Sequence, residues 1–218
     1  MNNREMALEY FRKDVAGHQM QVLRDDGVYR HLLFKKPGTG IHHFNVITYP
    51  GTLVYTGDMG SFVFQRLEDM FQFFSSDADR GDGINPGYWA EKLVAIDRSG
   101  NTDFNEEKFT RVVMEYLISW IRENRDRTTK DERRELWEAV VNDVVNADCD
   151  TKGTRKQIAA HDFWHEVRLT SGRTYSFNFV DFWEHSFDDY TVQFYWACYA
   201  IAWAVKQYDA ANLAKEAA

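Results

Sequence analysis

The chain has 218 residues, of which 44% are hydrophobic and 16% aromatic, and its formal net charge at pH 7 is −8. This length can bury a large apolar core, so we predict one folded domain over residues 1–218, which can include a helical subregion at 105–160. Lys and Arg are scattered among the acidic residues instead of forming one stripe, which disfavours direct binding of duplex nucleic acid.

Cysteine usage and the start of the chain bear on the cellular compartment. The two cysteines, Cys149 and Cys198, are too few for a disulfide framework. Cys198 lies inside an apolar run, where a reduced thiol behaves as a small hydrophobic side chain. The opening sequence MNNREMALEYFRKD is charged and has no apolar stretch of the kind found in secretory signals. We therefore expect a cytoplasmic protein.

The first part of the chain combines a helix with β-rich runs. Apolar side chains recur at near-helical spacing over residues 3–16 and predict a short helix. Asp-Gly and Pro-Gly turn signals then separate the runs MQVLR, VYRHLLF, FNVITY and TLVYTG. These runs predict an antiparallel meander of three or four strands. Because FNVITY is apolar at nearly every position, we expect it to be a central strand covered on both faces.

Four helices are predicted after the meander. The first is the short segment RLEDMFQFF, and the second is INPGYWAEKLVAI, where Asn85 fits an N-cap ahead of Pro86. A longer helix starts at Asn105, and another follows Thr129 and Glu132, which match a capping box. The last two helices each carry one apolar stripe, so we expect them to pair antiparallel.

A β-hairpin is predicted for residues 163–179, FWHEVRLTSGRTYSFNF, because apolar and polar residues alternate on both sides of Ser-Gly-Arg. With a three-residue loop, Val167 faces Phe177 and His165 faces Phe179 on one buried side.

The run FYWACYAIAWAV, residues 194–205, contains no charged residue. It is too short to span a membrane, which takes about 20 apolar residues. Since it is apolar on every side, it predicts a core helix. The predicted fold class is therefore α+β: an N-terminal antiparallel meander and a later β-hairpin, packed with amphipathic helices around a buried apolar C-terminal helix.

No complete catalytic motif is present. His161 and His165 have the spacing of two metal ligands on a helix, but the predicted hairpin puts His165 on a strand, so we predict no metal site. His42 and His43 are adjacent on a predicted strand and should point to opposite faces. If the chain is an enzyme, its acid–base candidates are His43, His161 and Asp58, the last in the turn GDMGS.

The candidate binding residues are four acidic residues and one tryptophan. The segment DFWEHSFDD contains Asp181, Glu184, Asp188 and Asp189 without any Lys or Arg. It fits either an acidic binding surface or a solvated, helix-capping segment. Trp137 lies beside an apolar helix stripe and is a further candidate, since exposed Trp residues often anchor partners.

Three longer stretches resemble a family of uncharacterised proteins encoded by bacteriophages, prophages and plasmids of proteobacteria. They are HFNVITYPGTLVYTGDMGSFVFQRLEDMFQFF, GINPGYWAEKL and DFWEHSFDDYTVQFYWACYAIAWAVKQYD. The segment at 105–156 has no counterpart in this resemblance. No activity or catalytic residue comes with the family, so the resemblance implies a genomic context and not a mechanism.

That context implies an accessory gene used during infection or transfer. We predict a protein that acts in the bacterial cytoplasm and counters a host defence complex, such as a CRISPR effector, by stoichiometric protein binding. The alternatives are a small enzyme, either a hydrolase or a nucleotide-modifying protein, and a nucleotide-signal sponge whose aromatic side chains stack on bases. We predict no cofactor and no membrane association.

Overall fold

The computed structural model describes residues 1–77 and 81–216, and the chain forms two compact units. Unit 1 comprises Met1–Thr102 with Tyr190–Ala218, and unit 2 comprises Asp103–Asp189. The two hydrophobic cores share no residue in the described part of the chain. The subregion at 105–160 falls within unit 2, and a single domain over the whole chain stays a prediction.

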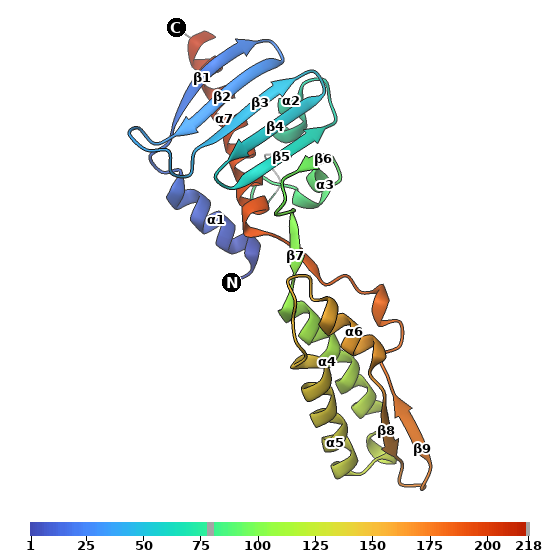
Figure 1. The fold of residues 1–218 in the computed structure, drawn as a ribbon. Helices are drawn as coiled ribbons and strands as arrows, with labels where there is room; N and C mark the ends of the chain where they lie inside the picture. The colour runs from blue at the N-terminus through green and yellow to red at the C-terminus, as the bar shows by residue number, and fades with distance from the viewer. Residues whose placement is uncertain (78–80, 217–218) are drawn as a thin grey trace. The chain divides into compact units, whose positions relative to one another are not determined.

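Unit 1 contains a six-stranded antiparallel sheet in which each strand pairs with its neighbour in sequence (Figure 1). The predicted antiparallel meander is confirmed, with six strands in place of the three or four that were expected. The strands are β1 (Gln19–Asp26), β2 (Tyr29–Lys35), β3 (Phe44–Tyr49), β4 (Thr52–Gly57), β5 (Gly60–Gln65) and β6 (Leu93–Ile96).

The third strand, β3, is an interior strand as predicted, but only one of its faces is buried. Phe44, Val46 and Thr48 lie in the core, whereas Ile47 is half-buried and Tyr49 is exposed. The helices of unit 1 cover one side of the sheet (Figure 1). The expectation that both faces are covered is therefore wrong, because cross-strand neighbours alone shield the outer apolar side chains.

Two predicted helices are shorter than their patterns suggest. α2 spans Met70–Ser75, and α3 spans Pro86–Ala90 with Asn85 as its N-cap, as predicted. The rest of the second segment, LVAI, is strand β6 and not helix, because it pairs with β5 and satisfies backbone groups at that edge of the sheet.

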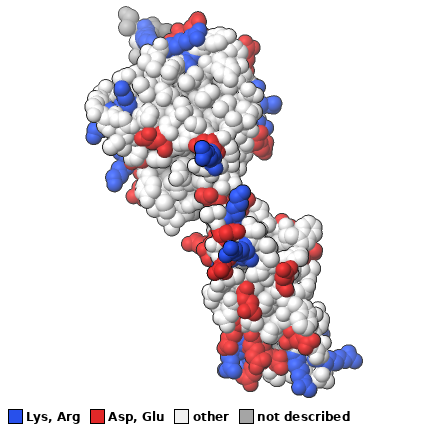
Figure 2. Space-filling model, in the orientation of Figure 1, with Lys and Arg blue, Asp and Glu red and all other residues white. Residues whose placement is uncertain are grey.

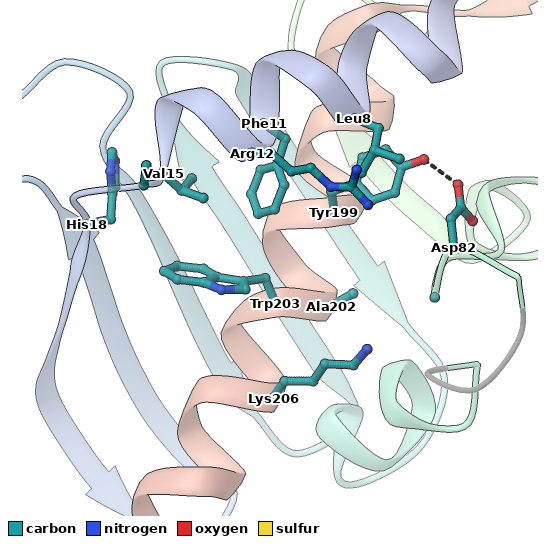
Figure 3. Close-up of a pocket in the computed structure, with 12 residues that line it drawn as sticks. Leu8, Phe11, Arg12, Val15, His18, Asp82, Tyr199, Ala202, Trp203 and Lys206 are labelled. Carbon is teal, nitrogen blue, oxygen red and sulfur yellow. Dashed lines mark hydrogen bonds between the residues drawn. The ribbon is translucent and has the colours of Figure 1, made fainter.

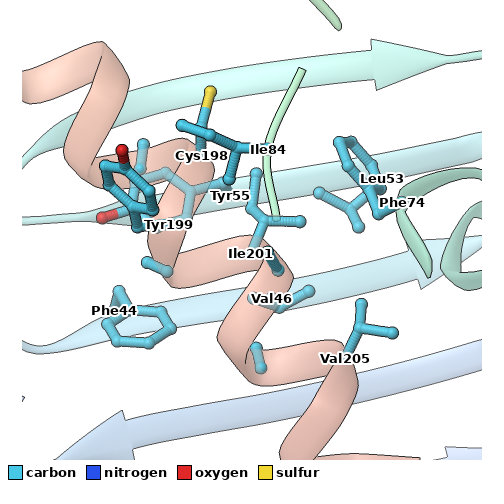
Figure 4. Close-up of a cluster of buried hydrophobic side chains, with 14 of the residues drawn as sticks. Phe44, Val46, Leu53, Tyr55, Phe74, Ile84, Cys198, Tyr199, Ile201 and Val205 are labelled. Atoms are coloured by element: carbon cyan, nitrogen blue, oxygen red, sulfur yellow. The ribbon is translucent and has the colours of Figure 1, made fainter. Parts of the chain in front are cut away.

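The apolar run lies in α7 (Val192–Glu216), which is the core helix of unit 1, as predicted. Every side chain from Phe194 to Val205 is buried except Trp203, which is half-buried. α1 (Asn3–Asp14) packs on α7. No helix among the described residues has both the length and the apolarity that a membrane span requires. Figure 4 shows buried side chains of α7, among them Cys198, Ile201 and Val205, together with side chains of the sheet such as Phe44, Val46 and Tyr55.

Unit 2 has a separate core. α4 (Glu106–Glu123) and α5 (Lys130–Val140) lie side by side in Figure 1, joined by the short turn η1 (Arg125–Arg127). The N-caps at Asn105 and Thr129 are as predicted, but the Glu132 side chain accepts from the Arg168 backbone N–H and does not complete a capping box. The apolar stripes of these helices thus cover the core of unit 2 and not α7. The core includes Phe109, Val113, Leu117, Leu136 and Val140.

The remaining elements of unit 2 follow α5. They are η2 (Val141–Val145), a π-helical turn, then α6 (Thr154–Asp162), the hairpin of β8 (His165–Arg168) and β9 (Thr174–Phe177), and η3 (Phe182–Glu184). β10 (Asp188–Tyr190) pairs with β7 (Thr102–Phe104) where the chain passes between the units.

The hairpin is confirmed, but its predicted register is wrong. His165 pairs with Phe177 and Val167 with Tyr175, so the partner of each β8 residue is two positions earlier than expected. The loop begins at residue 170 and ends at Gly172, whose φ of +79° suits the last position of a three-residue loop. Because side chains alternate between the two faces of a strand, a shift of two positions leaves each side chain on its predicted face, and Val167 and Phe177 are both buried.

Candidate functional site

Two of the three acid–base candidates, Asp58 and His43, lie together in unit 1. Asp58 is in the turn between β4 and β5, where Gly57 pairs with Gly60. A Cβ at Gly57 would lie 2.3 Å from the His43 carbonyl oxygen, so only glycine lets the turn approach the segment before β3 this closely. As a result, Asp58 Oδ1 lies 3.1 Å from His43 Nδ1.

His42 and His43 precede β3 and are not part of it, so the prediction that they point to opposite faces of a strand is wrong. His42 has a φ of +57°, in the left-handed region that is costly for a residue other than glycine. In this conformation its backbone N–H donates to Asp58 Oδ2 at 2.6 Å, and its ring Nδ1 lies 3.3 Å from Asp14 Oδ1. Each histidine therefore faces a carboxylate.

Asp14 connects this polar network to the core of unit 1. Its Oδ2 accepts a hydrogen bond from Trp196 Nε1 of α7 at 3.1 Å. His18 Nε2 lies 2.9 Å from the His42 carbonyl oxygen and donates to it, because a carbonyl can only accept. The network thus joins α1, α7 and the segment before β3, and it holds His42 in its strained conformation.

The hydrogen bonds of His43 define its tautomer. His43 Nδ1 lies 2.8 Å from the Gly40 carbonyl oxygen, so Nδ1 carries the hydrogen and Nε2 of the neutral ring presents a lone pair. Nε2 is therefore the ring atom that can act as a base, while Asp58 and Gly40 hold the orientation of the ring at Nδ1. The side chains of His43 and Asp58 are 39% and 40% exposed, so the ring is accessible and their attraction is screened by solvent.

An open cavity of about 450 Å³ lies beside His43. Its other lining residues are Leu33, Lys35, Gly38, Thr39 and Gly40.

The third acid–base candidate, His161, belongs to unit 2. Its Nδ1 lies 2.7 Å from Asp162 Oδ1 on a surface where both side chains are about 70% exposed. Within residues 1–77 and 81–216, no group of three or more His, Cys, Asp or Glu could hold a metal ion. Burial raises the pKa of the Cys198 thiol far above its usual value, so this buried cysteine is not a nucleophile.

A second cavity of unit 1, of about 470 Å³, lies between α1 and α7 (Figure 3). The rings of Phe11, Tyr199 and Trp203 line it, and Arg12 and Lys206 extend along its sides. Aromatic faces beside cationic side chains can hold a flat anionic molecule such as a nucleotide. This cavity is therefore the part of the chain that fits the nucleotide-sponge alternative.

One side of this second cavity is formed by Asp82, which accepts hydrogen bonds from Tyr199 Oη, drawn in Figure 3, and from Arg4 Nε at 2.9 Å. Burial alone would raise the pKa of Asp82, but the hydrogen bonds from Arg4 and Tyr199 outweigh it and lower that pKa. Burial and the bond to Asp82 raise the pKa of Tyr199. At neutral pH Asp82 therefore stays a carboxylate and Tyr199 a phenol, so this group is a structural clamp.

In unit 2, the predicted binding residues Asp181 and Glu184 flank Trp183, whose side chain is 73% exposed. Trp183 and Ile158, which is 53% exposed, border a cavity of about 360 Å³. Its other lining residues are Thr154, Gln157, His161, Phe182 and Phe187.

The segment that carries Trp183 is held in place. Phe182 is buried, and its ring centroid lies 5.7 Å from that of Phe109. The Tyr116 hydroxyl donates to the Val180 carbonyl oxygen at 3.0 Å and lies 3.1 Å from His185 Nε2. Trp183 thus has an exposed side chain on a backbone segment that buried packing and hydrogen bonds hold in place.

The other predicted binding residues are less prominent. Trp137, on α5, is 39% exposed. Asp188 and Asp189 belong to β10, and Asp189 Oδ2 accepts from Asn105 Nδ2 at 3.4 Å, which makes it part of the structure around the start of α4. Sequence reasoning missed Trp183, because its neighbour Phe182 is equally aromatic and no periodicity tells which of the two is buried.

Negative charge is concentrated in unit 2. Residues 103–189 contain 19 Asp and Glu against 13 Lys and Arg, so they account for six of the eight net negative charges. On the face shown in Figure 2, groups of acidic side chains lie along unit 2 with Lys and Arg among them, whereas unit 1 has a wide white area with charged side chains of both signs around it.

No protein-family model, no curated protein and no solved structure matches this chain. The functional argument therefore depends on the residues described above.

Proposed function

We propose that this protein acts by binding a basic surface of another protein through unit 2, with Trp183 as the central anchor. The observation that supports the proposal most is that the Trp183 side chain is 73% exposed although packing and hydrogen bonds hold its backbone segment in place. Trp residues dominate the binding energy of many interfaces because one ring buries a large area. An anchor that is already ordered loses little conformational entropy on binding.

The surroundings of Trp183 suit an interface. Ile158 adds apolar surface, and the adjoining cavity of about 360 Å³ can receive a side chain of the partner. Asp181 and Glu184, which precede and follow Trp183 in the chain, are exposed acidic residues that can supply a polar rim. Apolar anchors within a polar rim are the usual anatomy of protein–protein interfaces.

The charge of unit 2 defines the chemistry of the partner. An excess of six acidic residues attracts a basic surface and speeds the encounter with it. Surfaces that bind nucleic acid are basic, because they neutralise phosphates. A nucleic-acid-binding complex of a bacterial defence system, such as a CRISPR effector, fits this description, and stoichiometric binding there would counter the defence.

Phage plating tests this proposal. The chain is expressed in hosts that each carry one defence system, and sensitive phages are plated. We expect rescue against a system with a basic nucleic-acid-binding component. Rescue should be lost with Trp183→Ala and kept with Tyr49→Ala, which truncates an exposed aromatic side chain of unit 1. The absence of rescue in every host would count against counter-defence, and full rescue by Trp183→Ala would count against this surface.

The second candidate function is enzymatic, and the contact between His43 and Asp58 is the observation that favours it. Activity screens on nucleotides and ester substrates separate it from protein binding. Turnover that is abolished by Asp58→Ala and kept by Trp183→Ala would support an enzyme. A nucleotide that binds without turnover, and loses affinity in Arg12→Gln at the cavity between α1 and α7, would support the sponge alternative.

A further inference from the structure

We propose that the cavity beside His43 binds a small organic molecule through its oxyanion group, with Lys35 and His43 as the two ligands. All the residues that line this cavity belong to unit 1. The site is therefore separate from the protein-binding surface proposed for unit 2, and either proposal can fail without the other.

The strand register brings the two ligands together. β2 and β3 pair Leu33 with Asn45 and Phe34 with Phe44. Lys35 directly follows and His43 directly precedes the paired residues Phe34 and Phe44, and both side chains line the cavity. Lys35 forms no hydrogen bond or ion pair with the residues that the structure describes, so its ammonium group is available to a ligand.

The hydrogen-bonding state of His43 explains why the ligand should be an anion. Its Nδ1–H is used by Gly40 and Asp58, which leaves Nε2 as the atom free to meet a ligand. Once Nε2 is protonated, it becomes a donor next to the Lys35 ammonium. Two neighbouring cations repel each other unless an anion lies between them, and an oxyanion can accept hydrogen bonds from both.

The cavity is larger than a simple ion needs. Its volume of about 450 Å³ is in the range of sites for small organic ligands, and Leu33 offers an apolar surface beside the two polar groups. A Cβ at Gly38 or Gly40 would meet no atom within 4 Å, so the wall formed by this loop leaves space for a ligand. We therefore assign the site to a small aromatic or aliphatic molecule with one phosphate or carboxylate group.

Calorimetric titration of the full chain with phenyl phosphate, benzoate and inorganic phosphate tests the site. One of the two organic anions should bind at least about tenfold more tightly than inorganic phosphate, which identifies the preferred group. Lys35→Gln and His43→Gln should each weaken binding by about tenfold or more. Lys36→Gln, which changes the neighbouring exposed lysine, is the matched control.

Thermal unfolding of each variant separates the loss of a ligand contact from the loss of the fold. Equal binding by folded Lys35→Gln and wild type, or an affinity for the organic anions no higher than for inorganic phosphate, would overturn the proposal.

Discussion

Unit 1 and unit 2 use their tryptophans differently. In unit 1, Trp89 and Trp196 are fully buried, and Trp203 is half-buried against α1. In unit 2, Trp137, Trp164 and Trp183 are 39%, 60% and 73% exposed. Exposure of large aromatic side chains costs stability and is common at binding surfaces. The contrast teaches that unit 1 keeps its tryptophans in or against its core, whereas three tryptophans of unit 2 are exposed at its surface.

The ion pairs of the two units include a similar contrast. In unit 1, Arg30 and Asp69 form a two-point ion pair at 2.8 and 2.9 Å, with side chains only 10% and 19% exposed. In unit 2, Arg134 pairs with Asp131 and Glu138 at 3.7 Å, and all three side chains are more than 60% exposed. Each unit also contains the other kind of pair, since Arg24–Asp26 of unit 1 is exposed and Lys156 of unit 2 is buried beside Glu106. Exposed pairs contribute little to stability, so the charges around Arg134 stay accessible at the surface.

We expect the largest loss of stability from a substitution that disrupts the core of unit 2 and leaves the core of unit 1 intact. Phe109→Ala removes a fully buried ring of unit 2 and should lower the free energy of unfolding by about 3–5 kcal/mol. Because the cores share no described residue, hydrogen exchange should accelerate in α4 and α5 but not in α7. Equal acceleration in all three helices would show that the chain unfolds as one cooperative body.

The next effect concerns the Arg30–Asp69 pair. Asp69→Ala removes the ion pair and the N-cap of α2, where Asp69 Oδ1 accepts from the Phe71 backbone N–H at 2.9 Å. We expect a loss of about 3 kcal/mol at pH 7, measured by urea unfolding. Arg134→Ala in unit 2 is the matched control and should cost less than about 1 kcal/mol.

The effect of Asp69 should depend on pH. Burial alone would raise the pKa of Asp69, but the hydrogen bonds from Arg30 and the Phe71 N–H outweigh it and lower that pKa. A carboxyl with a lowered pKa stabilises the fold above the unfolded-state value of about 3.9, and this contribution is lost as the pH falls through the folded-state pKa. The difference between wild type and Asp69→Ala should therefore shrink below about pH 4. A difference that grows in acid would contradict this assignment.

A smaller effect of opposite sign is expected at Tyr55. Its hydroxyl is buried and has no hydrogen-bond partner among the residues that the structure describes, and burial is the main cause that raises its pKa. Tyr55→Phe removes this unsatisfied group and should leave the free energy of unfolding unchanged or raise it by up to about 1 kcal/mol. A loss of more than about 1 kcal/mol would show that the hydroxyl has a partner, such as a bound water.

The smallest effect is expected at the proposed anchor. Trp183→Ala should change the free energy of unfolding by less than about 0.5 kcal/mol, because the exposed ring contributes little to the core. Thermal unfolding measures this directly. A larger loss would mean that Trp183 supports the fold of unit 2, and binding defects of the variant would then need another explanation.

Much of the fold could be predicted from local patterns. The uncharged run at 194–205 predicts the core helix, and turn signals separate most strands of the sheet. Local signals failed where a long-range partner decides the outcome. The segment LVAI continues a helical pattern but pairs with β5, and the hairpin register depends on which loop residue adopts a positive φ, namely Gly172.

The candidate sites were harder to predict for the same reason. Asp58 and His43 were identified singly, but their contact depends on the close approach of Gly57 to the His43 backbone. Asp181 and Glu184 were identified as an acidic segment, whereas the exposed anchor between them was missed. Composition can indicate acid–base and binding residues, but their convergence depends on tertiary packing.

The most direct test of the central claim is a titration of the defence complex found by phage rescue, in which loss of its nucleic-acid binding is followed as this chain is added. We predict inhibition that is complete at one chain per binding site, unchanged for Tyr49→Ala and absent for Trp183→Ala at the same concentration. Inhibition by Trp183→Ala with the same endpoint and affinity as the wild type would contradict the assignment of unit 2 as the binding surface.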